Sequence, residues 1–76
     1  MKYEEAKALA DEELISCLAG YFDINSAHEG YALLKEELDE LWLEIKKKPR
    51  ARSKKRMAGE AKQIAALAVR FMMDLC

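Results

Sequence analysis

Hydrophobic residues recur along two long stretches of the chain at intervals of three and four positions. The first series consists of Tyr31, Leu34, Leu38, Leu41 and Ile45. The second series consists of Met57, Ala61, Ile64, Ala68, Phe71 and Leu75. This spacing places the apolar side chains on one face of an α-helix, so it predicts two long helices, each with a buried stripe. Trp42 flanks the first stripe, where it would pack in the core or in a dimer interface, or stack on a base.

Capping residues mark where these helices begin and end. Ser26 followed by Glu29 has the spacing of a capping box, which predicts the start of the first long helix. Pro49 disfavours helix at the residue before it, so this helix should end near residue 48. Ser53 is the expected N-cap of the second long helix. Residues 3–19 are also helical in pattern, as one helix or as two, and Gly20 is a suitable end.

The composition favours a single all-α domain spanning residues 1–76. Of its 76 residues, 51% are hydrophobic and 36% are charged, with three glycines, one proline and no strand signal. So short a chain buries only about 60% of its unfolded surface. Between Ile64 and Met73 only Arg70 is charged, which leaves a surplus apolar face. We therefore expect a helical hairpin-based small bundle that homodimerisation completes into a four-helix-type core; whether dimers pair into a tetramer stays open.

Several classes of protein do not fit the sequence. The first four residues already include Lys2 and Glu4, unlike a secretory signal peptide. No apolar run approaches the roughly 20 residues that span a bilayer. The two cysteines, Cys17 and Cys76, allow one bridge at most and thus no disulfide framework. We expect a cytoplasmic protein with free thiols and no membrane partner.

Charge is segregated along the chain. Eight of the eleven residues from 46 to 56, here called the basic linker, are basic and none is acidic. The other 65 residues carry five bases and fourteen acids, a net charge of −9. This linker is either a solvated loop or a set of cations for the phosphates of a substrate or of nucleic acid. It lacks the interleaved aromatic side chains that stack on bases, so single-strand stacking is not indicated. The candidate substrate-phosphate ligands are Lys47, Lys48, Lys54 and Lys55.

Residues 35–45 concentrate acidic side chains on the first long helix. The acids are Glu36, Glu37, Asp39, Glu40 and Glu44. At 100° per residue, Glu37, Glu40 and Glu44 border the apolar stripe, and Glu60 and Gln63 border the stripe of the second long helix. If the two helices pack antiparallel, three carboxylates and one amide oxygen would meet, a donor set that suits magnesium or manganese. The alternative is a solvated acidic face balanced by the linker lysines.

The spacing of these acids also matches a family motif. Residues 36–40 read Glu-Glu-Leu-Asp-Glu, and after 19 further residues the chain reads Glu60-Ala61-Lys62-Gln63. Over residues 26–76 the chain therefore resembles the MazG-like, all-α nucleoside triphosphate pyrophosphohydrolases, which carry EExxE on one helix and ExxD on the next. The departure is Gln63 in place of Asp, which removes one negative charge while keeping an oxygen ligand.

The resemblance implies an activity and a role for each motif residue. Glu37, Glu40 and Glu60 would be ligands of Mg²⁺ or Mn²⁺ together with Gln63, and Glu36 would be catalytic, helping to hold a metal or to position water. A homodimer or tetramer would hydrolyse an NTP or dNTP to a monophosphate and pyrophosphate by attack of water on the α-phosphorus. Two alternatives stay open. One is a catalytically impaired MazG-fold interaction or regulatory module; the weaker one is a small helical nucleic-acid-associated protein that uses the basic linker.

Overall fold

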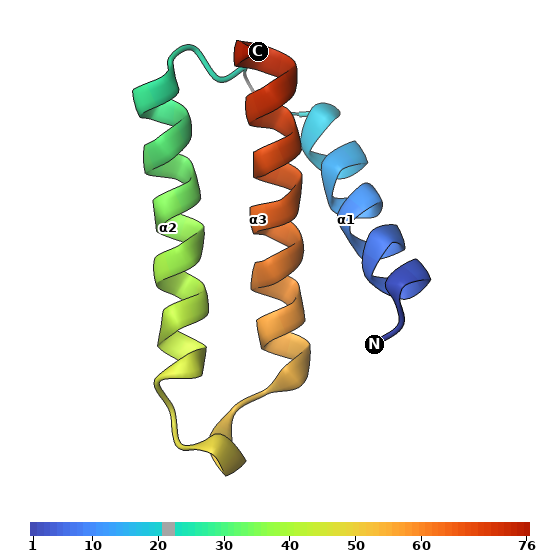
Figure 1. The fold of residues 1–76 in the computed structure, drawn as a ribbon, viewed down its shortest axis with the longest axis vertical. Helices are drawn as coiled ribbons and strands as arrows, with labels where there is room; N and C mark the ends of the chain where they lie inside the picture. Colours follow the sequence, from blue (N-terminus) through green and yellow to red (C-terminus); the bar gives the residue numbers. More distant parts are fainter. Residues whose placement is uncertain (21–22) are drawn as a thin grey trace.

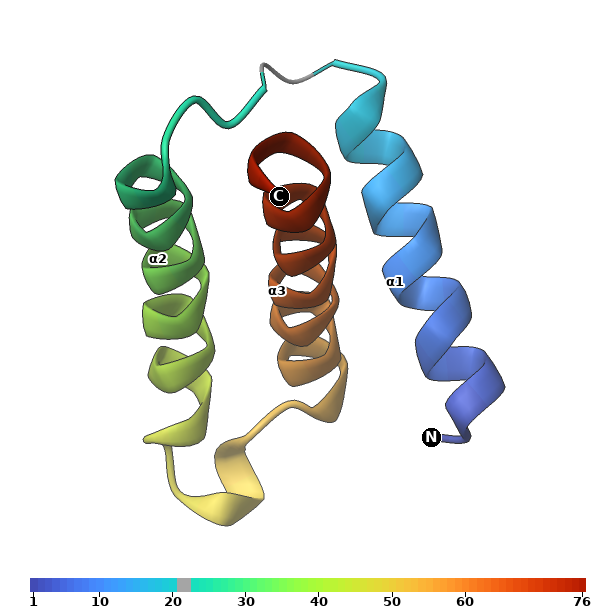
Figure 2. The same ribbon diagram turned by 45° about the horizontal axis from the view of Figure 1, so that its top comes forward.

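The computed structural model describes residues 1–20 and 23–76, and these residues fold into α-helices with no strand. The helices are α1 (Tyr3–Leu18), α2 (Ala27–Ile45) and α3 (Lys54–Leu75), with a short 3₁₀ turn, η1 (Pro49–Ala51), between the last two. Helices α2 and α3 form an antiparallel hairpin, and α1 packs on the other side of α3 (Figures 1 and 2). The predicted all-α class is confirmed.

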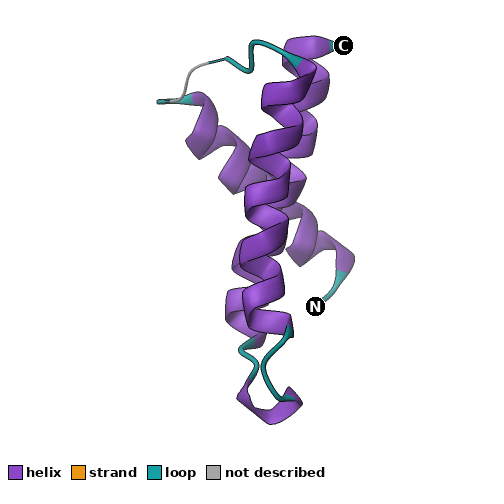
Figure 3. Ribbon diagram, turned by 90° about the vertical axis from the view of Figure 1, so that its left-hand side faces the viewer, coloured by secondary structure: helices purple, strands orange, loops and turns teal. Residues whose placement is uncertain are grey.

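The N-terminal stretch forms one helix rather than two. Helix α1 is continuous from Tyr3 to Leu18, and the backbone N–H of Gly20 donates to the carbonyl of Cys17 just beyond its end. In the view turned by 90°, α1 crosses the hairpin at an angle (Figure 3). The described part of the chain therefore places α3 between α1 and α2.

Serine side chains cap both long helices, as predicted. The Ser26 hydroxyl accepts a hydrogen bond from the Glu29 N–H, and the Ser53 hydroxyl accepts one from the Arg56 N–H, both at 3.1 Å. These contacts satisfy backbone donors that have no partner within the helix. Helix α2 ends at Ile45, earlier than the position near residue 48 predicted from Pro49. At this end Arg52 Nε donates a hydrogen bond to the Ile45 carbonyl at 2.7 Å, so a linker side chain supplies a donor to the last carbonyl of the helix.

The face that α2 packs on α3 differs from the predicted apolar stripe. Gly30 and Glu44 are buried, whereas Tyr31 and Leu38 are 67% and 52% exposed, so their predicted burial is wrong for the single chain. The reason is the close approach at Gly30, where an added Cβ would lie 2.5 Å from the Phe71 ring. Because Gly30 lies against α3, the residues seven and fourteen positions later, on the same face of α2, also lie toward α3. These residues are the acidic Glu37 and Glu44.

Few side chains are fully enclosed in this fold. Among the described residues, the buried hydrophobic side chains are those of Ile24 and Ala66. The Ile24 N–H donates to Asp74 Oδ2 at 2.9 Å, and the same oxygen lies 3.6 Å from Arg70 Nη2. These contacts fasten the segment before α2 to the C-terminal end of α3, and they commit Asp74 to a structural role.

Two further features concern the thiols and the length of the helices. Cys17 and Cys76 are both free thiols. Burial, followed by the nearby carboxylate of Glu13, raises the pKa of the Cys17 thiol, which disfavours its reactive thiolate. In the described part of the chain, no helix is long and apolar enough to cross a bilayer.

Candidate metal centre

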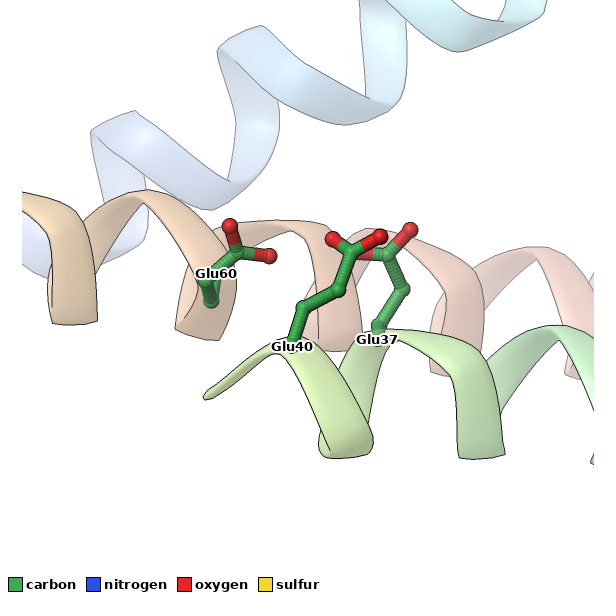
Figure 4. A group of neighbouring side chains, drawn as sticks. All are labelled: Glu37, Glu40 and Glu60. Carbon is green, nitrogen blue, oxygen red and sulfur yellow. The ribbon is translucent and has the colours of Figure 1, made fainter. Parts of the chain in front are cut away.

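Three glutamates from two helices meet on one side of the hairpin. Glu37 and Glu40 stand one turn apart on α2, and Glu60 comes from the facing part of α3. Each offers a carboxylate oxygen, and these oxygens all lie within 4.8 Å of one another. In Figure 4 the three side chains rise on the side of the hairpin on which α1 lies. We call these three residues the acid cluster.

The electrostatics of the acid cluster oppose full ionisation. Burial, followed by the neighbouring carboxylates of Glu40 and Glu60, raises the pKa of Glu37 from its ordinary value to about 7. Burial also raises the pKa of Glu60, again with a contribution from Glu40. Carboxylates that share a site cannot all be charged at low cost, so the cluster retains a proton near neutral pH unless a cation neutralises it.

Two oxygens of the cluster lack a donor. Glu37 Oε2 and Glu60 Oε2 are buried, and neither has a hydrogen-bond partner in the described part of the chain. Buried acceptors of this kind normally find a donor or an ion. Because the donor set is all oxygen and carries several negative charges, it fits a hard divalent cation such as Mg²⁺ or Mn²⁺.

Two openings flank the acid cluster. The inner cleft lies among the three helices, has a volume of about 330 Å³, and is lined by Glu37 together with the apolar side chains of Leu33 and Leu67. The linker groove has a volume of about 370 Å³ and is lined by Glu40 and Glu60. The cluster thus borders both openings, with Glu37 on the inner cleft and Glu40 and Glu60 on the linker groove.

The two remaining motif residues take different positions. Gln63 lines both openings, so it lies beside the acid cluster as the antiparallel hairpin required. Glu36 is exposed and stands one turn before Glu40, outside the group of three converging carboxylates. The structure therefore brings together three of the predicted acids and places Glu36 at the edge of the site.

The candidate phosphate-binding lysines divide between two places. Lys47 lines the linker groove. Lys54 and Lys55 line a separate groove together with Met1 and with Leu9 of α1. Lys48 is exposed and lines none of these three openings. Lys47 is the predicted lysine that shares an opening with the acid cluster.

Glu44 holds the hairpin connection rather than joining the cluster. It is 6% exposed and accepts hydrogen bonds from the Ser53 N–H at 2.9 Å and from Lys47 Nζ at 3.0 Å. Arg56 lies 3.9 Å away as a further cation. The Ser53 N–H, followed by Lys47, lowers the pKa of Glu44, so this carboxylate stays charged while Glu37 resists ionisation.

Sequence reasoning missed three cations at the site, of which Lys62 lines the linker groove. Arg56 lines the linker groove, and its position one turn before Glu60 on α3 could have indicated this. Arg70 lines the inner cleft and is only 5% exposed. Its separation of two turns from Gln63 places both on the same face of α3, a signal that could have linked them.

Known proteins add no constraint to this geometry. No family model matches the chain, and no curated protein sequence or solved structure matches it. The candidate metal centre is therefore defined by its own residues, by their burial and by their charge.

Proposed function

We propose that the protein is a MazG-like nucleoside triphosphate pyrophosphohydrolase that converts an NTP or dNTP to a monophosphate and pyrophosphate with Mg²⁺. The observation that carries the proposal is the acid cluster. Its carboxylate oxygens lie within 4.8 Å of one another, and Glu37 Oε2 and Glu60 Oε2 are buried without a donor in the described residues. The EExxE spacing of residues 36–40 supports the same activity.

Each motif residue has a role in this proposal. Glu37, Glu40 and Glu60 hold Mg²⁺, or Mn²⁺ in its place, and Gln63 adds an amide oxygen. When bound, the cation screens phosphate charge and lowers the pKa of a coordinated water. Glu36, exposed at the edge of the site, orients the attacking water. Water adds to the α-phosphorus, the bond to the oxygen that bridges the α- and β-phosphates breaks, and pyrophosphate leaves.

The two openings suit the two ends of a nucleotide. In the linker groove, Lys47 and Arg56 provide cations for the phosphates, and the salt bridges of both residues to Glu44 hold them in place. In the inner cleft, Leu33 and Leu67 offer apolar surface to a base. Gln63 can both donate and accept hydrogen bonds there. The triphosphate would thus lie next to the acid cluster, with the base on its apolar side.

The proposal also includes a homodimer and a cytoplasmic location. A homodimer would supply the enclosed core that the single chain lacks, since no large side chain among the described residues is fully buried. Free thiols at Cys17 and Cys76 and a nucleotide substrate are in keeping with a cytoplasmic protein.

Pyrophosphate release from a panel of ribo- and deoxyribonucleoside triphosphates tests the activity. We expect release that requires Mg²⁺ and falls roughly 100-fold in Glu60→Gln, because the site loses one of its negative charges and keeps only a neutral amide oxygen at this position. The matched control is Asp39→Asn, which removes the same charge from an exposed position paired with Lys35 at 3.3 Å. This control should keep the activity of the unmodified protein.

The outcomes separate the alternatives. Mg²⁺ binding without pyrophosphate release from any triphosphate would support a catalytically impaired module instead. Salt-sensitive nucleic-acid binding that weakens when the basic linker is neutralised would support a nucleic-acid-associated protein. Equal loss of activity in Glu60→Gln and Asp39→Asn would contradict the assignment of Glu60 as a ligand.

A further inference from the structure

The groove that contains Lys54 and Lys55 adjoins the linker groove. It has a volume of about 470 Å³ and is lined by three lysines, Lys54, Lys55 and Lys62, with the apolar side chains of Leu9 and Ala58. We call it the lysine groove. Gly59 and Lys62 line this groove and also the linker groove, which holds two residues of the acid cluster. A path therefore leads from the acid cluster over Gly59 and Lys62 into the lysine groove.

This path is open because residue 59 has no side chain. Gly59 lies inside α3, where a glycine is destabilising relative to alanine. A Cβ added at this position would meet no atom within 4 Å, so no packing contact in the described part of the chain requires a glycine. Glycine is also the residue that lets a ligand approach the backbone closely. Gly59 is thus suited to a ligand that passes over α3.

The lysine groove presents positive charge without an internal counter-charge. No acidic side chain lines it, and in the described part of the chain none of its three lysines forms an ion pair. Lys62 is half-buried, although lysine side chains are mostly exposed. Lys47 and Arg56 of the linker groove differ in this respect, since Glu44 pairs with both. A cleft lined by cations alone attracts an anionic ligand.

The first turn of α3 adds to this positive charge. It contains Lys54, Lys55 and Arg56 and no acid. The N-terminus of a helix carries a partial positive charge, so acids are favoured there and cations are disfavoured. A negatively charged ligand in the lysine groove would relieve this repulsion.

We propose that the linker groove and the lysine groove form one channel for a linear phosphate chain longer than a triphosphate, with Lys62 at the junction. Every unit of such a chain is negatively charged, so successive units meet successive cations. At 1.5 Å per residue, the path from Glu60 back to Lys54 covers about 9 Å along α3. Inorganic polyphosphate and nucleosides with four or more phosphates share this chemistry. Only the choice of phosphate over another anion rests on the proposed function, because Mg²⁺ sites combine a few carboxylates with substrate phosphates.

Titration calorimetry at a fixed concentration of free Mg²⁺ tests the channel, with linear inorganic chains of three and six phosphates as ligands. We expect the six-unit chain to bind at least about tenfold more tightly, since a single added hydrogen bond between charged groups is worth this much. Lys62→Gln removes the cation at the junction, and Gly59→Leu fills the path. Each variant should abolish the gain from the longer chain.

Two features make these variants interpretable. Leucine is a good helix former and a side chain at residue 59 has room at its Cβ, so Gly59→Leu should fold, which circular dichroism checks. The matched control is Lys7→Gln, because Lys7 is an exposed lysine of α1 that lines neither groove. This control loses the same charge as Lys62→Gln and should keep the gain.

Further ligands distinguish the two sources of the chain. Tighter binding of adenosine tetraphosphate than of inorganic tetrapolyphosphate would support a nucleoside polyphosphate, and equal binding would support an inorganic chain. Equal affinities for three and six phosphates, or a gain that persists in both Lys62→Gln and Gly59→Leu, would overturn the proposal. So would equal affinity for an oligothymidylate of similar charge, since this would indicate a general polyanion surface.

The proposed function and the channel can fail separately. The comparison of two chain lengths cancels what the acid cluster contributes to both, and it requires no hydrolysis. A gain with chain length in a protein that releases no pyrophosphate would support the channel and contradict the activity. Pyrophosphate release without a gain would support the activity and contradict the channel.

Discussion

Glu37 of α2 and Glu60 of α3 bring carboxylate oxygens within 4.8 Å of each other, and both residues keep Oε2 buried without a donor in the described part of the chain. Like charges this close and this poorly solvated are costly. Either a proton or a cation must neutralise part of the charge. The pair therefore links the pH dependence of stability to metal binding.

The stability of the metal-free protein should fall as pH rises toward neutral. Glu37 has a pKa of about 7 in the fold against 4.5 for an ordinary glutamate. Between these values the folded chain keeps a proton that the unfolded chain releases, so the free energy of unfolding decreases with rising pH. With EDTA present, the melting temperature should be lower at a pH of about 7.5 than at about 5.5.

Glu37→Gln supplies the control for this titration, since a glutamine cannot ionise. The variant should flatten the fall in melting temperature between these two pH values. Glu44 does not interfere with this measurement, because its pKa is lowered in the fold. Its contribution to the free energy of unfolding is lost only as the pH falls below the ordinary range of a glutamate. An equally steep fall in Glu37→Gln would show that another group dominates.

Gln63→Asp should strengthen Mg²⁺ binding. Gln63 lines both openings beside the acid cluster, so a carboxylate there adds a negative charge next to the cation. We expect an affinity gain of roughly tenfold, about 1.4 kcal/mol, by titration calorimetry. Gln63→Asn keeps a neutral amide and should show no gain. Equal affinities in the aspartate and asparagine variants would mean that residue 63 does not face the ion.

Two glycine substitutions should have opposite effects on stability. In Gly30→Ala the new methyl group would meet Phe71 ring carbons at 2.5 and 2.7 Å, and this overpacking should cost about 1–3 kcal/mol. A Cβ added at Gly59 would meet no atom within 4 Å, so Gly59→Ala should gain roughly 0.5–1 kcal/mol in the free energy of unfolding from helix propensity. Urea denaturation measures both changes. Equal gains in the two variants would contradict the close approach of α2 to α3 at Gly30.

Glu44→Gln should lower the melting temperature by several degrees, because a neutral amide has a single acceptor oxygen and cannot accept from both Lys47 Nζ and the Ser53 N–H as the carboxylate does. Thermal unfolding followed by circular dichroism measures the change. Glu36→Gln removes an exposed acid from the same helix and should leave the melting temperature nearly unchanged. Equal effects would show that Glu44 is no more structural than a surface acid.

Local chemistry made the helix starts predictable, because Ser26 and Ser53 satisfy backbone donors through contacts that span three residues. The meeting of Glu37 and Glu40 with Glu60 followed from helix periodicity once an antiparallel hairpin was assumed. Both predictions depend on short-range geometry that the spacing of residues encodes directly.

The rotation of α2 against α3 was not predictable in the same way. Periodicity identified the apolar row that contains Tyr31 and Leu38, but the close approach at Gly30 turns a different face toward α3. The role of Glu44 was hidden for a related reason, since its main donor, the Ser53 N–H, lies nine residues away across the linker. Such contacts depend on how the chain turns between helices, which periodicity does not describe.

The central claim is that the acid cluster binds Mg²⁺, and thermal unfolding with and without Mg²⁺ tests it most directly. At 100 times the dissociation constant, binding should stabilise the fold by about 2.7 kcal/mol, which raises the melting temperature by roughly 10–20 °C in a domain of this size. Glu40→Gln should abolish this rise, whereas Asp39→Asn, which changes an exposed acid paired with Lys35, should retain it. An unchanged melting temperature for the unmodified protein, or an equal rise in Glu40→Gln, would contradict the metal centre.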